Sequence, residues 1–183
     1  MSIYGGKELA AAFRTVRGNT VRVVEDIPED TFDFVAAPGM RTVRSLVGHM
    51  LWAPRMYEGF HRTNPLTTLK GFDFGAVMAV AGAFEAEPRT KSQLVALLKG
   101  DGENFAAWME TLSDTFLAET YTDPTGANPK SRLESLLSPK EHEMHHRAQL
   151  MLILRLVGGV SHLTRERQAR AAAHAMAAPA PQA

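Results

Sequence analysis

The chain has 183 residues, which is enough for one domain with a full hydrophobic core. Lys plus Arg and Asp plus Glu number 20 each, so the formal charge is zero and no overall basic field favours nucleic acid. Cysteine is absent, which excludes disulfides, thiolate ligands and a cysteine nucleophile, and leaves His, Asp and Glu to bind any metal.

Four long segments show the apolar periodicity of amphipathic helices. They cover about residues 6–27, 42–61, 91–117 and 132–157. Pro28 stops the first segment, and Thr42 is a plausible N-cap of the second. The fourth contains Ser138, Pro139 and Glu141, a good helix start, so it either kinks at Pro139 or consists of two helices.

The remaining segments connect or extend these helices. We expect a short helix at 72–84 in the long connection, a loop at 123–129, a helix at about 164–176 and a disordered end at 179–183. No alternating strand pattern persists anywhere. The sequence thus predicts an all-α protein: a four-helix bundle domain at 1–160, with a long crossover between the second and third main helices, and an Arg/Ala-rich extension at 161–183.

The N-terminus lacks the apolar run of a signal peptide, and the most apolar stretches, 74–84 and 150–160, are too short to span a bilayer. We therefore expect a soluble, cytoplasmic protein whose partners include neither nucleic acid nor a membrane.

The most informative motif is His142-Glu143-Met144-His145-His146. Residues four apart lie on one helix face, so His142 and His146 can bind one metal ion together. At about 100° per residue, both share the apolar stripe of the fourth helix, and His49 shares that of the second. Burying an imidazole without a polar partner costs desolvation free energy. One metal ion bound by all three explains their clustering better than three core histidines that each have a separate hydrogen-bond partner.

Neighbouring residues have candidate roles around this predicted metal site. Glu143 lies about 100° from His142 and could act as a base, or be a solvated helix carboxylate. Gln149 and His145 are candidates for outer contacts that orient the ligands. Arg147 points away and is expected to pair on the surface. Three large side chains are expected to pack the core rather than line a substrate pocket: Met56, Tyr57 and Trp108.

Two other metal motifs fit less well. The zinc peptidase motif H-E-x-x-H needs a third ligand downstream, but the extended pattern would place Gly at Gln149 and His at Leu152. A di-iron carboxylate bundle needs two Glu-x-x-His pairs, and the pair Glu58 and His61 should point away from the core. We therefore favour a single ion bound by three histidines.

Two stretches carry a resemblance to a known family: Ser45–Met50 around His49, and His142–Leu150, which contains His-x-x-x-His followed by Arg and Gln. The chain resembles the DinB/YfiT-like superfamily over roughly residues 6–158. Ala148 replaces a common Gly, and Met40 stands where many members have Trp.

This resemblance implies a four-helix bundle, often a homodimer, with a three-histidine site for zinc or nickel. It also implies relatives that are hydrolases or use low-molecular-weight thiols as cosubstrates. We expect a metal-dependent transferase or hydrolase of small molecules, with His49, His142 and His146 as ligands. The alternative is a non-catalytic bundle that acts through dimerisation or partner binding.

Overall fold

The computed structural model describes residues 4–63 and 66–177. Its helices are α1 (Gly6–Asp26), α2 (Val43–Arg62), α3 (Phe74–Ala86), α4 (Lys91–Glu110), α5 (Asp114–Ala118), α6 (Arg132–Leu156) and α7 (His162–Ala177), with a 3-10 turn, η1 (Glu29–Thr31). Two short strands, β1 (Thr120–Tyr121) and β2 (Lys130–Ser131), pair antiparallel. The terminal residues 179–183, for which we predicted disorder, lie outside the described part of the chain.

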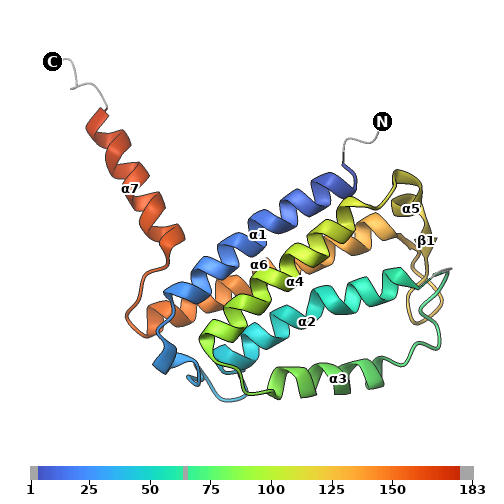
Figure 1. The fold of residues 1–183 in the computed structure, drawn as a ribbon, viewed down its shortest axis with the longest axis horizontal. Coiled ribbons are helices and arrows are strands. Elements are labelled where there is room, and N and C mark those ends of the chain that lie inside the picture. The colour runs from blue at the N-terminus through green and yellow to red at the C-terminus, as the bar shows by residue number, and fades with distance from the viewer. Residues whose placement is uncertain (1–3, 64–65, 178–183) are drawn as a thin grey trace.

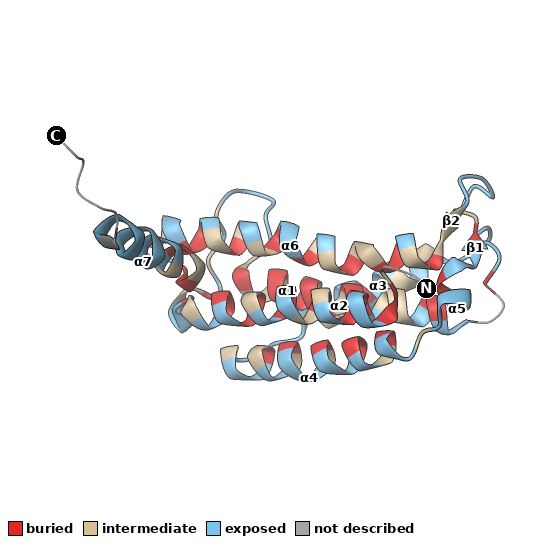
Figure 2. Cartoon of the chain, turned by 90° about the horizontal axis from the view of Figure 1, so that it is seen from above, coloured by how far each residue is buried: buried red, intermediate tan, exposed pale blue. Residues whose placement is uncertain are grey.

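The four long helices α1, α2, α4 and α6 form the predicted bundle, and α3 lies along α2 in the long crossover (Figure 1). Buried residues line their facing sides, while the residues on the outward sides are exposed (Figure 2). One cluster of buried side chains lies near the α1–α2 turn, and a second surrounds Phe13 and Phe105 between α1 and α4. The buried ion pair of Arg17 with Glu143 and the cluster of His49, His142 and His146 interrupt this apolar core.

The fourth predicted segment is one continuous helix. Ser131 caps α6, because its side chain accepts a hydrogen bond from the Glu134 N–H, and Pro139 lies inside the helix. Of the two alternatives left open by the sequence, the structure has the single helix that passes through Pro139, and no second helix begins at Ser138. Pro139 is buried, and the packing of this long helix outweighs the backbone hydrogen bond that proline cannot donate.

The third predicted segment ends earlier than expected. It breaks after Glu110 at the end of α4, and Ser113 caps the short α5 by accepting a hydrogen bond from the Phe116 N–H. The small β1–β2 hairpin was not predicted, because two-residue strands carry no alternating pattern. Its loop is the predicted turn region, held by the Asp123 side chain, which accepts hydrogen bonds from Thr125 and Asn128.

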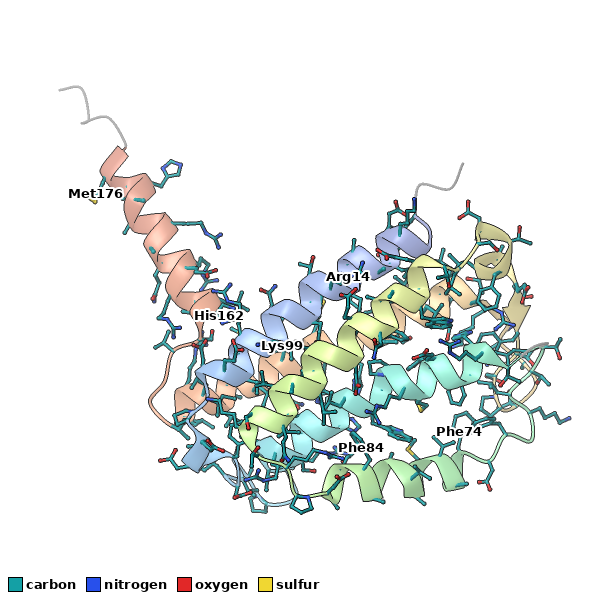
Figure 3. All side chains as sticks on the ribbon, in the orientation of Figure 1. Arg14, Phe74, Phe84, Lys99, His162 and Met176 are labelled. Carbon is teal, nitrogen blue, oxygen red and sulfur yellow. The ribbon has the colours of Figure 1, made fainter. Side chains whose placement is uncertain are left out.

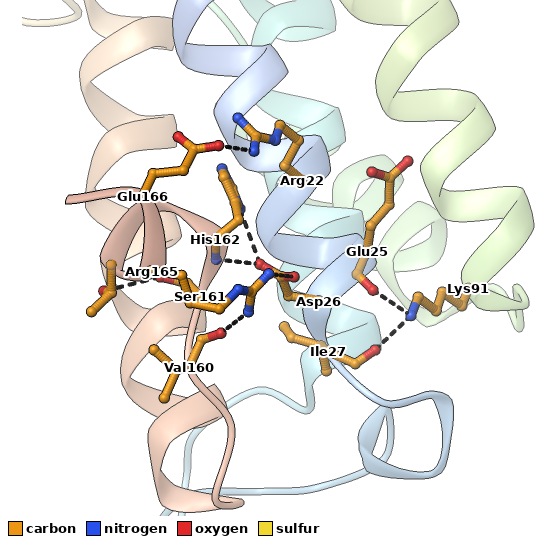
Figure 4. Close-up of polar contacts among 11 residues, drawn as sticks. Arg22, Glu25, Asp26, Ile27, Lys91, Val160, Ser161, His162, Arg165 and Glu166 are labelled. Atoms are coloured by element: carbon orange, nitrogen blue, oxygen red, sulfur yellow. Dashed lines mark hydrogen bonds and ion pairs between the residues drawn. The ribbon is translucent and has the colours of Figure 1, made fainter. Parts of the chain in front are cut away.

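The helix α7 leaves the bundle at the end of α6 and extends away from it (Figure 1). Its first turn is fixed to α1 through Asp26, which accepts hydrogen bonds from the His162 N–H (2.6 Å) and from Arg165 (2.7 Å), as Figure 4 shows. Arg22 and Glu166 form a further ion pair between the two helices. Among the described residues, every helix is too short or too polar to cross a membrane.

Candidate metal centre

Three imidazoles from two helices converge between α2 and α6. His49 belongs to α2, and His142 and His146 lie one turn apart on α6. His142 Nε2 lies 3.0 Å from His49 Nε2 and 3.1 Å from His146 Nε2, and the donor atoms of all three lie within 4.8 Å of one another. The structure thus brings together the three residues selected from the helical facing.

The partners of the outer ring nitrogens determine the tautomers of two rings. His49 Nδ1 lies 2.6 Å from Glu85 Oε1, and a carboxylate can only accept, so His49 carries its proton on Nδ1. His146 Nδ1 lies 2.8 Å from Gln149 Oε1, which gives the same tautomer. Both Nε2 atoms therefore present lone pairs, and one proton on His142 Nε2 cannot satisfy both. A cation between the three rings would accept all three lone pairs.

The donor set and its spacing fit a divalent transition metal. Zinc–nitrogen bonds of about 2.0–2.1 Å place neighbouring nitrogens of a tetrahedral site about 3.3 Å apart, close to the two distances observed here. Imidazole ligands suit zinc and nickel alike. Three protein ligands leave at least one coordination position open, as in catalytic rather than closed structural sites.

The electrostatics of the cluster favour neutral histidines, which is the form that binds metals. Burial, and then the neighbouring imidazoles and Arg41, lower the pKa of His142 from 6.5 to about 4. Burial also lowers the pKa of His146, against the opposing effect of its hydrogen bond to Gln149. Both rings are therefore neutral near pH 7, and a metal ion need not compete with bound protons.

Several outer contacts orient the imidazoles. Gln149 contacts His146, as above, and its Nε2 lies 3.1 Å from His145 Nε2, so both predicted outer residues lie beside the cluster. Glu85 was missed by the sequence analysis: it bridges His49 and Arg41, whose Nε lies 2.8 Å from Glu85 Oε2. The only signal in the sequence is that Glu85 is the first charged residue after an apolar run, which gives no hint of its partner.

Glu143 does not lie with the histidines. Its carboxylate is 1% exposed and pairs with Arg17 of α1, which donates from Nε to both oxygens at 3.0 and 2.9 Å. The prediction of a base at Glu143, and the alternative of a solvated carboxylate, are both wrong, because the 100° rotation turns this side chain toward α1. The H-E-x-x-H interpretation thereby loses its catalytic carboxylate.

Other expected orientations also need correction. His61 is buried rather than outward-facing: its Nε2 lies 3.0 Å from Ser135 Oγ, and Arg132 donates to its backbone carbonyl. Glu58 pairs with Arg62, so the di-iron arrangement is still not formed. Arg147 is partly buried and donates to the Val16 carbonyl at 3.2 Å, instead of pairing on the surface.

A pocket of about 430 Å³ adjoins the cluster between α2 and α3. Phe74 and Phe84 of α3 extend toward α2, where their rings contact Phe60 and Trp52 (Figure 3). Met56 and Tyr57, which we expected in the core, line this pocket instead; Trp108 packs against Phe105 as expected. The lining comprises Arg41, His49, Trp52, Ala53, Met56, Tyr57, Met78, Ala81, Gly82, Glu85 and His142.

Comparison with known proteins gives one family and a set of similar folds. The sequence pattern of the DinB superfamily matches residues 12–150. YfiT from Bacillus subtilis, described as a probable metal-dependent hydrolase with an unusual four-helix bundle topology, is 20% identical, with a TM-score of 0.68 over 86% of this chain and 90% of that one.

Two further solved structures share this fold. A DinB-like protein from Bacillus subtilis is 20% identical, with a TM-score of 0.61 over 82% of this chain and 92% of that one. The mycothiol-dependent maleylpyruvate isomerase is 15% identical, with a TM-score of 0.61, and the similarity covers 80% of this chain and 61% of that longer one. No curated protein matches the chain in sequence.

Proposed function

Because the chain belongs to the DinB superfamily, we propose that it is a metal-dependent enzyme that binds one divalent ion through His49, His142 and His146. The observation that carries this proposal is the convergence of three imidazole Nε2 atoms beside an open pocket. Zinc and nickel are the favoured ions. The description of YfiT as a probable metal-dependent hydrolase supports the same conclusion.

The proposed reaction is a transfer or hydrolysis on a small molecule. A divalent ion with three neutral ligands supplies Lewis-acid chemistry: it lowers the pKa of a water or thiol in its open position and polarises a carbonyl. The pocket of about 430 Å³ is the size of a small-molecule site, and its largely apolar lining excludes water from one side. A low-molecular-weight thiol is a suitable cosubstrate, since the chain has no cysteine of its own.

The chain's own residues would hold the reactants and the ligands in place. Glu85 keeps the His49 ring oriented through Nδ1, and Gln149 does the same for His146. Among the described residues of the pocket lining, Glu85 is the single carboxylate, and both of its oxygens are already engaged. The peptidase alternative loses support, because the motif's Glu143 is committed to Arg17.

Metal analysis of the purified protein tests this proposal. We expect one divalent ion per chain by mass spectrometry, no ion in His142→Ala, and a full ion content in the control His174→Ala, which changes an exposed histidine of α7. A screen with activated esters and with thiol cosubstrates should show turnover that disappears when the ion is removed. Ion binding without any turnover would favour the alternative of a non-catalytic metal-binding bundle. The absence of ion binding would overturn both the proposed enzyme and this alternative.

A further inference from the structure

Arg41 lies between two pockets that adjoin the histidine cluster. It lines the pocket of about 430 Å³ together with His49 and His142, and a smaller one of about 150 Å³ together with His146 and Gln149. Its side chain is 45% exposed. Only its Nε is used, in the ion pair with Glu85, and its two terminal nitrogens have no partner among the described residues.

The pocket lining has unused donors but no unused carboxylate. Besides the terminal nitrogens of Arg41, the Trp52 Nε1 and the His142 Nδ1 are buried without a partner among the described residues. Both oxygens of Glu85 already accept hydrogen bonds. A ligand rich in acceptor atoms, such as an anion, would satisfy the exposed terminal nitrogens of Arg41, whereas an organic cation would find no unpaired carboxylate in the lining.

The net charge of the lining leads to the same ligand class. Arg41 and Glu85 are its only ionic side chains among the described residues, and they neutralise each other. A divalent ion on the three histidines would add two positive charges, which favours an anionic substrate. The rest of the lining is largely apolar and includes Trp52, Met56 and Met78, so it suits an aromatic or aliphatic group.

From this arrangement we infer that the substrate is an apolar carboxylate, or a similar small organic anion, whose charged group binds the free edge of Arg41. The inference rests on the proposed function and names the substrate class of that same pocket. A guanidinium can donate two parallel hydrogen bonds to a carboxylate, so its terminal nitrogens would fix the orientation of the bound molecule.

The test compares 4-phenylbutyrate with its neutral isostere 4-phenylbutanamide, by calorimetry on the zinc-loaded protein. We expect the acid to bind at least ~10-fold tighter than the amide. Arg41→Gln should lose about tenfold in affinity for the acid and nothing for the amide, while keeping one zinc ion per chain. Arg55→Gln is the matched control, because Arg55 pairs with Asp101 and lines only a neighbouring pocket.

The decisive quantity is the loss of affinity for the acid in Arg41→Gln relative to wild type. The preference of wild type for the acid over the amide is not sufficient, because the carboxylate could also contact the zinc ion itself. The inference is overturned if wild type binds both probes equally or neither of them. It is also overturned if Arg41→Gln binds the acid normally, loses both probes alike or loses its zinc. Failure of wild type to bind zinc would instead overturn the proposed function on which the inference rests.

Discussion

Two glutamates illustrate how the site is determined at the scale of single residues. Glu143 is a direct neighbour of His142 in sequence, yet it forms a buried ion pair with Arg17. Glu85 lies 36 residues from His49 and is in contact with it. Adjacent residues on a helix point in different directions, whereas residues from two packed helices can meet. The histidine spacing was therefore predictable from sequence, but the partner of His49 was not.

Exchanging the two carboxylates for amides should separate their roles. Glu85→Gln keeps an acceptor for His49 but removes the negative charge beside its ring, so we expect zinc affinity to fall roughly 10- to 100-fold. Competition titration with a chelator measures this affinity. Unchanged affinity would show that Glu85 does not support the ligand.

Glu143→Gln is the matched control for that measurement. It should keep its zinc affinity in the folded protein, because Glu143 does not contact the cluster. It leaves Arg17 as an uncompensated buried charge, so the free energy of unfolding should fall by about 3–5 kcal/mol. Urea unfolding of the zinc-free protein measures this loss. A drop in zinc affinity without a loss of stability would contradict the structural role of Glu143 as the partner of Arg17.

At the scale of elements, the close packing of α3 on α2 brings Glu85 to His49. Gly48, the residue before His49, makes this possible: a Cβ built there would lie 3.3 Å from the Cα of Glu85. Apart from Arg41, which precedes α2, and His142 of α6, the lining of the pocket comes from the same two helices. The short crossover helix therefore supplies both a wall of the pocket and the partner of a proposed ligand.

Gly48→Ala should disturb the site through this contact. The added methyl group meets backbone rather than a flexible side chain, so α3 must move outward and the contact of Glu85 with His49 should lengthen. We expect zinc affinity to fall by roughly tenfold. Gly59→Ala is the control, because a Cβ there meets nothing within 4 Å and should stabilise α2 by up to about 1 kcal/mol. Equal zinc affinities in the two variants would contradict this account.

The elements also show which parts of the fold the sequence could predict. The four long helices and the crossover helix follow from apolar periodicity and caps, as at Thr42, whose side chain accepts from the Ser45 N–H. The sequence left two alternatives open at Pro139, and the break before Ser113 was missed, since both features depend on packing against other helices. Local signals specify where a helix can begin, and tertiary contacts decide between the possibilities.

At the scale of the whole molecule, buried histidines link stability to pH. His61 is buried, and burial followed by the charge of Arg132 lowers its pKa from 6.5 to about 4. Between these values the unfolded chain binds a proton that the folded chain excludes. The stabilisation from this group is therefore complete above pH 6.5 and is lost as the pH falls toward 4.

Urea unfolding of the zinc-free protein at a series of pH values tests this linkage. We expect the free energy of unfolding to fall between pH 6.5 and 4, with His61 contributing about 3 kcal/mol and His142 adding to the loss in the same range. In His61→Gln, the fall in the free energy of unfolding between pH 6.5 and 4 should be smaller by the contribution of His61. The control His174→Gln should show the same pH dependence as wild type. A profile that His61→Gln leaves unchanged would show that this histidine does not couple folding to protons.

The position of the metal ion tests the central claim most directly. Crystals of the zinc-loaded protein, measured on both sides of the zinc absorption edge, should give one anomalous peak per chain. The account predicts that this peak lies about 2.0–2.1 Å from the Nε2 atoms of His49, His142 and His146. A peak at another place, or contact with fewer than these three histidines, would contradict it.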